Sequence, residues 1–355
     1  MSPSLRDKIP VAVLGATGAV GQRLLALLAD HPFFEVAELG ASERSVGRTF
    51  ADAVTWRLET PLPEVVAGKV VSPCKPEDLG APLIFSALDR HQASRIEPLF
   101  AAAGRTVISN ASAFRMEPDV PLVIAELNPD HLALIDIQRK KREWEGCLVA
   151  HPNCSTIGLT MALAPIHRAV GVRSLVVTTL QAASGAGYPG VSAMDLIDNV
   201  VPGIQGEEEK IESEPMKILG SLEGDGVAAA EMAITAHTHR VPVSDGHLMS
   251  VSLKCERPIS PAEAMEVLST FRGRPQERSL PSAPEDPIIV LNEEHRPQPR
   301  LDRDRGKGMS TTVSRVGRCS VLDLRFEVLT HNTVRGAAGG TLLIAEWMHS
   351  EGAWR

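Results

Sequence analysis

The chain has 355 residues, of which 43% are hydrophobic and 23% charged, and its formal net charge at pH 7 is −8. At roughly 150 residues per domain this length predicts two domains, and the composition excludes intrinsic disorder and collagen-like structure. The acidic balance argues against a protein whose main task is to bind nucleic acid or an anionic membrane. The sequence shows no apolar run of about 18 residues, no signal-peptide core and no CxxC pair, so we expect a cytoplasmic protein without a disulfide framework or cysteine-rich zinc site.

The first part of the chain, residues 10–150, is predicted to alternate between strands and helices. Val11–Leu14 is a short apolar run that stops at Gly15, which is typical of a buried parallel strand. The leucines between Leu24 and Leu28 then recur at helical spacing. This order predicts an α/β protein with an N-terminal Rossmann-type, doubly wound parallel sheet. Its further strands are predicted at Val36–Leu39, Val70–Val71, Leu83–Ser86, Thr106–Ser109 and Leu122–Ala125.

The pattern changes after residue 151, where the predicted strands become longer and richer in β-branched residues. Leu175–Ala182 and His247–Lys254 are predicted strands of an antiparallel or mixed sheet. Ser192–Val201 and Glu207–Leu219 are predicted helices, and Pro215 is expected to kink or end the second of them. The second domain is therefore predicted to be of the α+β type with a mixed sheet.

The last part of the chain is predicted to form a surface excursion and a terminal helix. Arg272–Ser310 is rich in Pro and Arg, with one apolar run at Ile288–Leu291, and we expect it to be ordered over the surface. Thr333–His349 is a predicted helix that returns to the first domain. The predicted domains are residues 1–153, completed by a C-terminal helix at 333–355, and residues 154–332.

A glycine-rich turn follows the first predicted strand. The spacing of Gly15, Gly18 and Gly21 is GxxGxxG, a variant of the dinucleotide fingerprint. Glycines at this place permit a tight turn and let backbone N–H groups approach a pyrophosphate at the helix N-terminus. Many glycine turns bind nothing, but the position after an apolar strand favours a dinucleotide. The predicted cofactor contacts here are Gly15, Thr17, Gly18, Ala19, Val20 and Gly21.

The end of the second predicted strand indicates which dinucleotide is bound. A site specific for NAD usually has an acid there that accepts from the ribose hydroxyls. Here Ser42, Arg44 and Ser45 instead offer donors for a 2′-phosphate, which favours NADP. The alternatives are a solvated loop with an incidental arginine, or a ribose contact from Glu38 or Glu43.

The segment His151–Thr156 carries the most distinctive chemistry of the sequence. Apolar residues at Ile157 and Met161 indicate that a helix begins just after Cys154. A helix N-terminus stabilises a thiolate through the dipole and the free N–H groups, which predicts a nucleophile near neutral pH. The alternative is an inert buried cysteine, which is the default for the remaining cysteines, Cys74, Cys147, Cys255 and Cys319.

Six segments in order along the chain resemble the aspartate-β-semialdehyde dehydrogenases, most closely their fungal and archaeal branch. The resemblance covers essentially the whole chain, and six segments in one order make a chance match very improbable. The segments are Gly15–Gly18, His151–Thr156, Gln181–Gly185, Gly206–Lys210, Arg240–His247 and Asn332–Gly339.

The resemblance implies a reaction and a catalytic set. The family reduces β-aspartyl phosphate with NADPH through a thioester on cysteine, releasing phosphate and the semialdehyde. Cys154 would be the nucleophile and His247 its acid–base partner, exchanging protons at physiological pH. Asn153 would steady the developing oxyanion, and Gln181 would orient the acyl group or the cysteine.

The resemblance also implies binding residues. Arg240 would hold the substrate α-carboxylate, Glu207 its ammonium, and Lys210, Arg115 and Asn110 the phosphate side of the site. Without the resemblance, Glu207 and Lys210 would read as an ordinary helix salt bridge. His331 stands where the family pattern leads us to expect an acid, and His237 and His239 are spaced like metal ligands, although we expect no metal. The remaining cofactor contacts implied are Ser86, Ser184, Gly185 and Asn332.

Three other functions remain open from the sequence alone. A malonyl-CoA-type acyl-CoA reductase would keep Cys154, His247 and Arg240 but would need no ammonium or phosphate pocket. An N-acetyl-glutamyl-phosphate reductase is a more distant possibility. An NADP-binding redox sensor would have no reason to keep nucleophile, base and carboxylate clamp together. The expected partners are the small-molecule substrate, inorganic phosphate and further copies of the chain in a homodimer or homotetramer, with residues 154–332 as the catalytic and dimerisation domain.

Overall fold

The computed structural model describes residues 8–354, which form two compact units. Unit 1 contains the chain up to Val123, Pro129–His151 and the chain from Thr341 onwards, and unit 2 contains Ile124–Asn128 and Pro152–Gly340. The division differs from the predicted one in three places. After His151 the chain enters unit 2 at Pro152 instead of at residue 154. Residues 124–128 belong to unit 2, and the return to unit 1 begins at residue 341 instead of 333.

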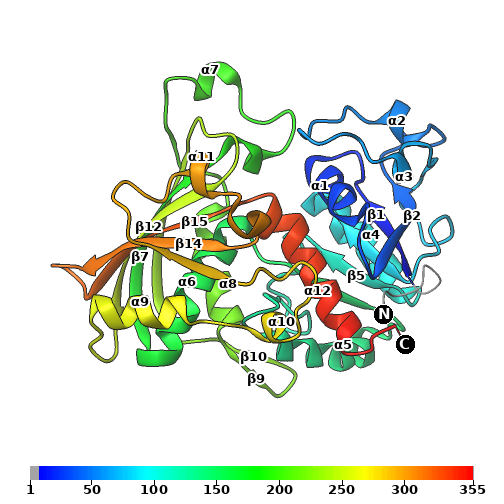
Figure 1. Ribbon diagram of the computed structural model, residues 1–355. Coiled ribbons are helices and arrows are strands. Elements are labelled where there is room, and N and C mark those ends of the chain that lie inside the picture. Colours follow the sequence, from blue (N-terminus) through cyan, green and yellow to red (C-terminus); the bar gives the residue numbers. More distant parts are fainter. Residues whose placement is uncertain (1–7, 355) are drawn as a thin grey trace. The chain divides into compact units, whose positions relative to one another are not determined.

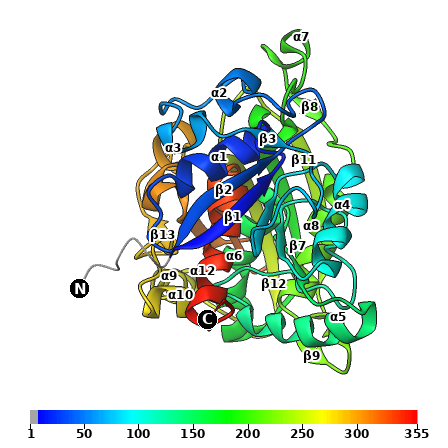
Figure 2. The same ribbon diagram turned by 90° about the vertical axis from the view of Figure 1, so that its right-hand side faces the viewer.

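Unit 1 is built on a six-stranded parallel sheet in the order β3-β2-β1-β4-β5-β6 (Figures 1 and 2). The strand order reverses between β1 and β4, and ligands bind such sheets at this reversal, beyond the carboxyl ends of the strands. Val11–Leu14 is entirely buried, as expected for a strand that has neighbours on both sides. The strands are β1 Ile9–Leu14, β2 Phe34–Gly40, β3 Val71–Ser72, β4 Leu83–Ser86, β5 Thr106–Ser109 and β6 Cys147–Ala150.

The helices of unit 1 include the one that the glycine turn leads into. It begins at Ala19 with Gly18 as its N-cap, and no side chain caps it. The terminal helix is held to this unit by a buried hydrogen bond of 2.9 Å between His31 Nε2 and Glu346 Oε1. The helices are α1 Ala19–Leu28, α2 Phe50–Ala53, α3 Glu64–Ala67, α4 Arg90–Ala102, α5 Leu134–Arg142 and, from Thr341, α12 Gly339–Ser350.

One predicted strand of unit 1 is wrong. Within Leu122–Ala125 only Leu122 pairs, in an isolated bridge to Ala150, and the chain turns at Ile124, whose N–H donates to the side chain of Asn128. The sixth strand is Cys147–Ala150, which pairs in parallel with β5. Both segments are short and apolar, so periodicity alone cannot separate them.

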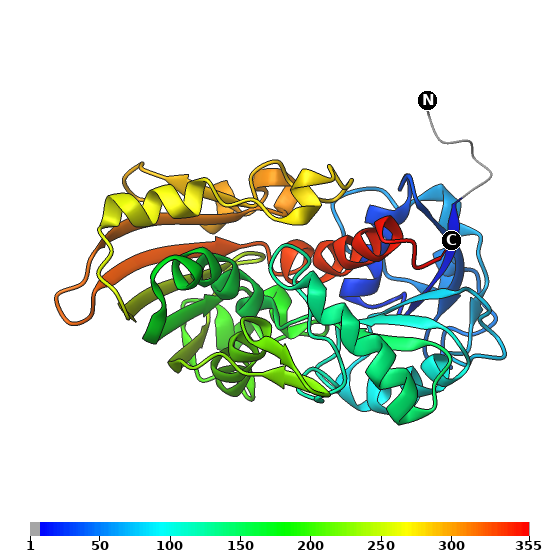
Figure 3. The same cartoon turned by 90° about the horizontal axis from the view of Figure 1, so that it is seen from below.

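Unit 2 is built on a seven-stranded mixed sheet in the order β13-β14-β15-β12-β7-β11-β8. Helix α6 Cys154–Val170 packs against α8 Glu207–Ile218 and against α9 Pro261–Ser269. Figure 3 shows the yellow α9 beside the orange strands of the sheet. The sheet strands are β7 Val172–Gln181, β8 Val201–Pro202, β11 Ala233–Arg240, β12 His247–Cys255, β13 Ile288–Leu291, β14 Thr311–Arg318 and β15 Leu324–Thr330, and a separate hairpin is formed by β9 Ser221–Glu223 and β10 Gly226–Ala228.

The register of this sheet brings three predicted site residues, Gln181, Arg240 and His247, to the same end of neighbouring strands. Gln181 ends β7 and lies beside Arg240, which ends the parallel strand β11. His247 begins β12, which runs antiparallel to β7, so it starts at the same edge where β7 ends. Residues about 60 positions apart in the sequence therefore become neighbours, because hydrogen-bond register fixes where each strand stops.

Several details of unit 2 differ from the expectations. Only α7, Ala193–Leu196, is helical within Ser192–Val201, at the tip of a projecting loop (Figure 1). Helix α8 continues through Pro215 to Ile218, because losing one N–H near the last turn does not stop a helix that is packed along its side. A π-helical turn at Val334–Ala338 precedes α12.

The predicted surface excursion is ordered, and its apolar run joins the sheet. Ile288–Leu291 forms the edge strand β13, parallel to β14. Two short helices complete the excursion, α10 Arg274–Glu277 and α11 Pro299–Asp302. In the part of the chain that the structure describes, no helix is long and apolar enough to cross a membrane.

Candidate active site

Cys154 is the first residue of helix α6, and Asn153 caps that helix. The Asn153 Oδ1 atom accepts hydrogen bonds from the backbone N–H groups of Ser155, at 2.9 Å, and Thr156, at 3.2 Å. Asparagine is among the preferred N-cap residues because its side chain satisfies these unpaired donors. The cap fixes the backbone at Cys154 and leaves its sulfur at the positive end of the helix dipole, which favours a thiolate.

His247 is the direct partner of the Cys154 sulfur, with 3.2 Å between Sγ and Nε2. The other ring nitrogen, Nδ1, accepts a hydrogen bond of 3.0 Å from the Ala182 backbone N–H. A nitrogen that accepts carries no proton, so the proton of the neutral ring lies on Nε2 and faces the sulfur. The geometry therefore matches a thiolate that accepts a hydrogen bond from a neutral imidazole.

The surroundings of His247 favour its neutral form. Its side chain is fully buried, and burial together with the neighbouring Arg240 guanidinium lowers the pKa of His247 to about 3. An imidazolium would also need a proton on Nδ1, directed at the Ala182 N–H. These surroundings favour the neutral imidazole at physiological pH.

Glu207 lies at the centre of the polar network. Its carboxylate accepts from Asn153 Nδ2, at 2.9 and 3.1 Å, and from Lys210 Nζ, at 2.7 Å. Burial alone would raise the pKa of Glu207, but the Lys210 ammonium and these hydrogen bonds outweigh it and hold that pKa below its usual value. Both polar atoms of the Asn153 side chain are therefore hydrogen-bonded: Oδ1 caps the helix and Nδ2 donates to Glu207.

Arg240 is buried and donates from Nη1 to the Ala182 carbonyl at 2.7 Å. Burial lowers the pKa of Arg240, while the negative charges of Cys154 and Glu207 act in the opposite direction. The charged groups described so far are thus two cations, Arg240 and Lys210, and the carboxylate of Glu207.

Gln181 is buried at the same sheet edge, where its amide approaches Glu207 Oε2 at 3.5 Å. Asn332 is also buried, and it connects two loops of the site. Its Oδ1 accepts from the Gly246 N–H and its Nδ2 donates to Ser184 Oγ, each at 2.8 Å. Gly185 packs on Arg240 and His247, since a Cβ there would lie 2.8 Å from Arg240 Nη1 and 3.1 Å from the His247 ring.

Two residues of this site were missed from the sequence. Glu214 is buried and accepts from the Asn153 backbone N–H at 2.7 Å, and it lies seven residues after Glu207, on the same face of α8. The seven-residue spacing from Glu207 was the sequence signal from which Glu214 could have been predicted. Gly336 sits in the π-helical turn, and a Cβ there would lie only 2.8 Å from the Cys154 Cβ. Its signal was its place within one of the six resembling segments.

The glycine turn of unit 1 fits a pyrophosphate. Gly15 has φ +72°, and a Cβ there would lie 2.6 Å from the Ala87 carbonyl oxygen. A Cβ on Gly21 would lie 2.3 Å from the Gly15 carbonyl oxygen, so both positions require glycine. Because no side chain caps α1 at Gly18, the helix N-terminus can bind an anion through its backbone.

The loop after β2 fits a 2′-phosphate better than a bare ribose. Glu38 is already occupied, because its two carboxylate oxygens accept from the backbone N–H groups of Gly80, at 3.0 Å, and Ala81, at 2.9 Å. Ser42 and Arg44 are exposed, and Ser45 is buried in the turn that they form. Arg44 is thus an exposed cation of this loop and the candidate partner of a 2′-phosphate.

The phosphate candidates of unit 1 lie at the carboxyl ends of β4 and β5. Arg115 is buried and donates from Nη2 to the Asn110 carbonyl at 2.7 Å. Asn110 Nδ2 donates to the Ser86 carbonyl at 3.2 Å, and its Oδ1 accepts from Thr341 at 2.8 Å. These residues are at the edge where ligands of parallel sheets bind, as predicted for this class of fold.

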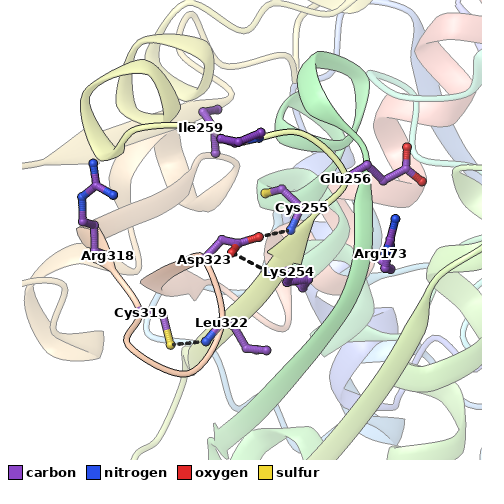
Figure 4. A pocket seen from close by; sticks show the side chains of 10 residues that line it. Arg173, Lys254, Cys255, Glu256, Ile259, Arg318, Cys319, Leu322 and Asp323 are labelled. Carbon is purple, nitrogen blue, oxygen red and sulfur yellow. Dashed lines mark hydrogen bonds and ion pairs between the residues drawn. The ribbon is translucent and has the colours of Figure 1, made fainter.

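Unit 2 also contains a cavity of about 320 Å³, whose lining is drawn in Figure 4 and includes none of the site residues described above. It is lined by Cys255 and Lys254, at the end of β12 opposite to His247, roughly 26 Å along the strand at 3.3 Å per residue. Its Lys254–Asp323 pair, at 3.0 Å, is partly exposed. Among the described residues, no cluster of His, Cys, Asp or Glu could hold a metal, His237 and His239 included.

Comparisons with known proteins identify relatives over nearly the whole chain. Residues 10–135 match the family "Semialdehyde dehydrogenase, NAD binding domain", and residues 163–335 match "Semialdehyde dehydrogenase, dimerisation domain". The chain is 47% identical over 341 residues to the aspartate-semialdehyde dehydrogenase of Archaeoglobus fulgidus, covering 96% of this chain and 98% of that one. It is 43% identical over 344 residues to that of Schizosaccharomyces pombe, covering 95% and 96%.

Solved structures agree with this result. The aspartate semialdehyde dehydrogenase of Candida albicans with NADP aligns with a TM-score of 0.90 at 42% identity, covering 97% of this chain and 99% of that one. Aspartate semialdehyde dehydrogenase II of Vibrio cholerae complexed with ASA aligns with a TM-score of 0.76 at 28% identity, with the same coverage. The resemblance to a fungal and archaeal branch and the predicted fold class are both confirmed.

Proposed function

Because this chain belongs to the aspartate-semialdehyde dehydrogenase family, we propose that it interconverts L-β-aspartyl phosphate and L-aspartate-β-semialdehyde in amino-acid biosynthesis. The proposed direction is the reductive one, with NADPH as cofactor and release of inorganic phosphate. The observation that carries the proposal is the Cys154–His247 pair at the N-terminus of α6, within a buried set of carboxylate and cationic groups.

The nucleophile is the Cys154 thiolate, which attacks the acyl carbon of the β-aspartyl phosphate. A C–S bond forms, the C–O bond to phosphate breaks, and the electron pair leaves with the phosphate. A hydride, which bound NADPH would supply, adds to the thioester carbon and gives a tetrahedral oxyanion still bonded to sulfur. Its collapse re-forms the C=O bond of the aldehyde, breaks the C–S bond and returns the thiolate. The helix dipole and the His247 Nε2–H both stabilise that anion.

His247 acts as a hydrogen-bond donor that stays neutral throughout. Its Nε2–H first donates a hydrogen bond to the thiolate. Once the C–S bond has formed, it can donate to the acyl oxygen of the substrate, on which negative charge develops, because that oxygen is on the carbon bonded to sulfur. A fixed donor of this kind needs no reorganisation during the reaction. The Ala182 N–H holds the ring in the tautomer that this task requires.

NADP is the cofactor that the residues of unit 1 fit. Gly15, Gly18 and Gly21 would hold its pyrophosphate and Arg44 its 2′-phosphate. When bound it supplies hydride exchange with the acyl carbon. The binding of NADP by the Candida albicans relative supports the choice.

The substrate groups find partners of opposite charge. The Arg240 fork suits the α-carboxylate, because a guanidinium binds a carboxylate bidentately. Glu207 suits the ammonium, and Lys210, three residues along the same helix, suits the phosphate. Arg115 and Asn110 are the phosphate candidates within unit 1. Asn153 and Gln181 orient Glu207 and the nucleophile. The match to a dimerisation domain supports a homo-oligomer, and we infer a dimer or a tetramer.

The wild-type enzyme distinguishes this function from that of an acyl-CoA reductase. NADPH oxidation is followed at 340 nm with β-aspartyl phosphate and, separately, with malonyl-CoA. In the reverse direction, NADP reduction with the semialdehyde is followed with and without phosphate. The proposal expects preference for the aspartyl substrate and strict phosphate dependence. Faster reduction of malonyl-CoA, or oxidation that ignores phosphate, contradicts it.

Arg44→Ala is expected to weaken NADP binding selectively. The variant removes a charge-assisted contact to the 2′-phosphate, worth about 1.5–3 kcal/mol, while NAD binding barely changes. Fluorescence titration with both cofactors measures the difference. Arg48→Ala is the matched control, since Arg48 already donates to the Asp52 carbonyl. Equal losses for NADP and NAD would make Arg44 a structural residue.

Glu207→Gln and Lys210→Met separate the ammonium from the phosphate. Glu207→Gln keeps the shape and an acceptor for Asn153 but removes the charge. The transition-state stabilisation derived from kcat/KM for the semialdehyde should therefore fall by about 2–5 kcal/mol. Lys210→Met should leave the KM for the semialdehyde nearly normal while the KM for phosphate rises steeply. Steady-state kinetics with each substrate varied in turn measure both. An unchanged phosphate KM would remove Lys210 from the phosphate site.

A further inference from the structure

The excursion between Arg272 and Ser310 contains a compact ionic cluster centred on Asp302. The carboxylate of Asp302 is buried and accepts from the Arg296 guanidinium, at 2.6 Å to Nε, from Arg305 Nε, at 2.8 Å, and from the Gln298 N–H, at 2.8 Å. Burial alone would raise the pKa of Asp302, but these donors outweigh it and lower the pKa to about 2. The cluster fixes the short helix α11 and the residues around it.

Arg303, the next residue, extends from this cluster to the loop that precedes His247. Its Nη1 lies 3.2 Å from Ser244 Oγ and 3.2 Å from the Asp245 carbonyl oxygen, and it donates to both. Gly246 packs against the same helix, because a Cβ there would lie 3.2 Å from the Pro299 Cβ and 3.3 Å from the Arg303 Cβ. The excursion is therefore in direct contact with Ser244–Gly246.

The opposite side of this loop contacts the rest of the site. The Ala183 N–H donates to the Val243 carbonyl at 2.7 Å, and the Ser184 N–H donates to the Ser244 carbonyl at 3.1 Å. The Gly246 N–H donates to Asn332 at 2.8 Å. Ser244–Gly246 is thus held from two sides, and the residue that follows it is His247. A shift of this loop would move the imidazole relative to the Cys154 sulfur.

We propose that Arg303 is a positioning residue, through which the excursion holds His247 in register with Cys154. The proposal rests on the role given to His247 under the proposed function. Arg303 touches neither sulfur nor imidazole and acts only through the loop. A displacement of the order of 1 Å is enough to lower a catalytic rate about 100-fold, so a surface segment without reacting groups can control the chemistry.

The test compares Arg303→Ala with Arg300→Ala in the full-length enzyme. Arg300 is exposed on the same helix and is therefore the matched control. Arg303→Lys is the conservative variant, which keeps one donor for the Asp245 carbonyl. Steady-state kinetics give kcat and KM, and thermal unfolding verifies that each variant is folded. The rate at which iodoacetamide alkylates Cys154, followed by mass spectrometry over a pH range, reports the thiolate without any substrate.

For Arg303→Ala we expect kcat to fall about 10- to 100-fold, the KM for NADP to stay unchanged, and Cys154 alkylation to require higher pH. Arg303→Lys should recover part of each effect, and Arg300→Ala should match the wild type. An Arg303→Ala enzyme with wild-type kcat and alkylation, or an equal loss in Arg300→Ala, overturns the proposal. Because alkylation needs no substrate, a wrong substrate assignment would leave this readout intact and would show only in the wild-type assays.

Discussion

Replacing Cys154 by alanine is expected to abolish turnover while leaving NADP binding intact. The covalent intermediate cannot form without the sulfur, but the glycine turn at Gly15–Gly21 belongs to the other unit and is unchanged. Turnover is measured by absorbance at 340 nm and NADP binding by fluorescence titration. Retention of more than a few per cent of activity would remove Cys154 from the mechanism.

Two further variants sharpen this test. Cys154→Ser should be nearly as inactive, because a hydroxyl is far less ionised than a thiol near neutral pH. Cys319→Ser is the matched control, since that thiol is partly exposed and lies at the distant cavity. Its sulfur accepts from the Leu322 N–H at 3.3 Å and contacts none of the site residues, so the variant should keep full activity. Equal losses in both positions would indicate a general effect on folding.

His247→Ala is expected to lower kcat about 10²–10³-fold, the usual effect of losing one fixed hydrogen-bond donor. His247→Gln should lose less, because its amide N–H can still donate toward the sulfur. Burial and Arg240 lower the pKa of His247 to about 3, below its ordinary value, so the ring gains a proton only far below neutrality. The wild-type pH–rate profile should therefore have no limb from this residue near pH 6.5.

The same measurements can refute the neutral-donor role. A wild-type limb near pH 6.5 that disappears in His247→Gln, with equal losses for alanine and glutamine, would assign acid–base catalysis to this imidazole. Cys154 alkylation across the same pH range gives an independent check. If His247 is a neutral donor, the alkylation rate should follow the titration of the thiol alone, without a second titration from the imidazole. For each variant, the pH dependence of the semialdehyde assay and that of Cys154 alkylation should show the same titrations.

Much of the fold could be predicted from local patterns. The apolar run Val11–Leu14 before a glycine turn has few other interpretations, and the start of a helix at Cys154 followed from its spacing of apolar residues. The strand at Cys147–Ala150 was missed because Leu122–Ala125 is equally short and apolar. The choice between them depends on which segment reaches β5, and this is a property of the whole sheet.

The identities of the nucleophile and its partner came from sequence, but the state of the partner did not. Whether His247 is protonated depends on the Ala182 N–H and on complete burial, which arise only when β7 and β12 pair. Arg303 could not be predicted for a similar reason. Its target is a backbone carbonyl 58 residues away in the sequence, and backbone atoms leave no signature in residue type.

The covalent intermediate on Cys154 is the centre of the account and can be observed directly. The enzyme is mixed with NADP and the semialdehyde without phosphate, quenched in acid, and its Cys154 peptide is examined by mass spectrometry. We expect an aspartyl thioester on Cys154 that matches the NADPH formed in the first turnover and disappears when phosphate is added before the quench. NADPH formation without an adduct, or an adduct on another cysteine, would contradict the account.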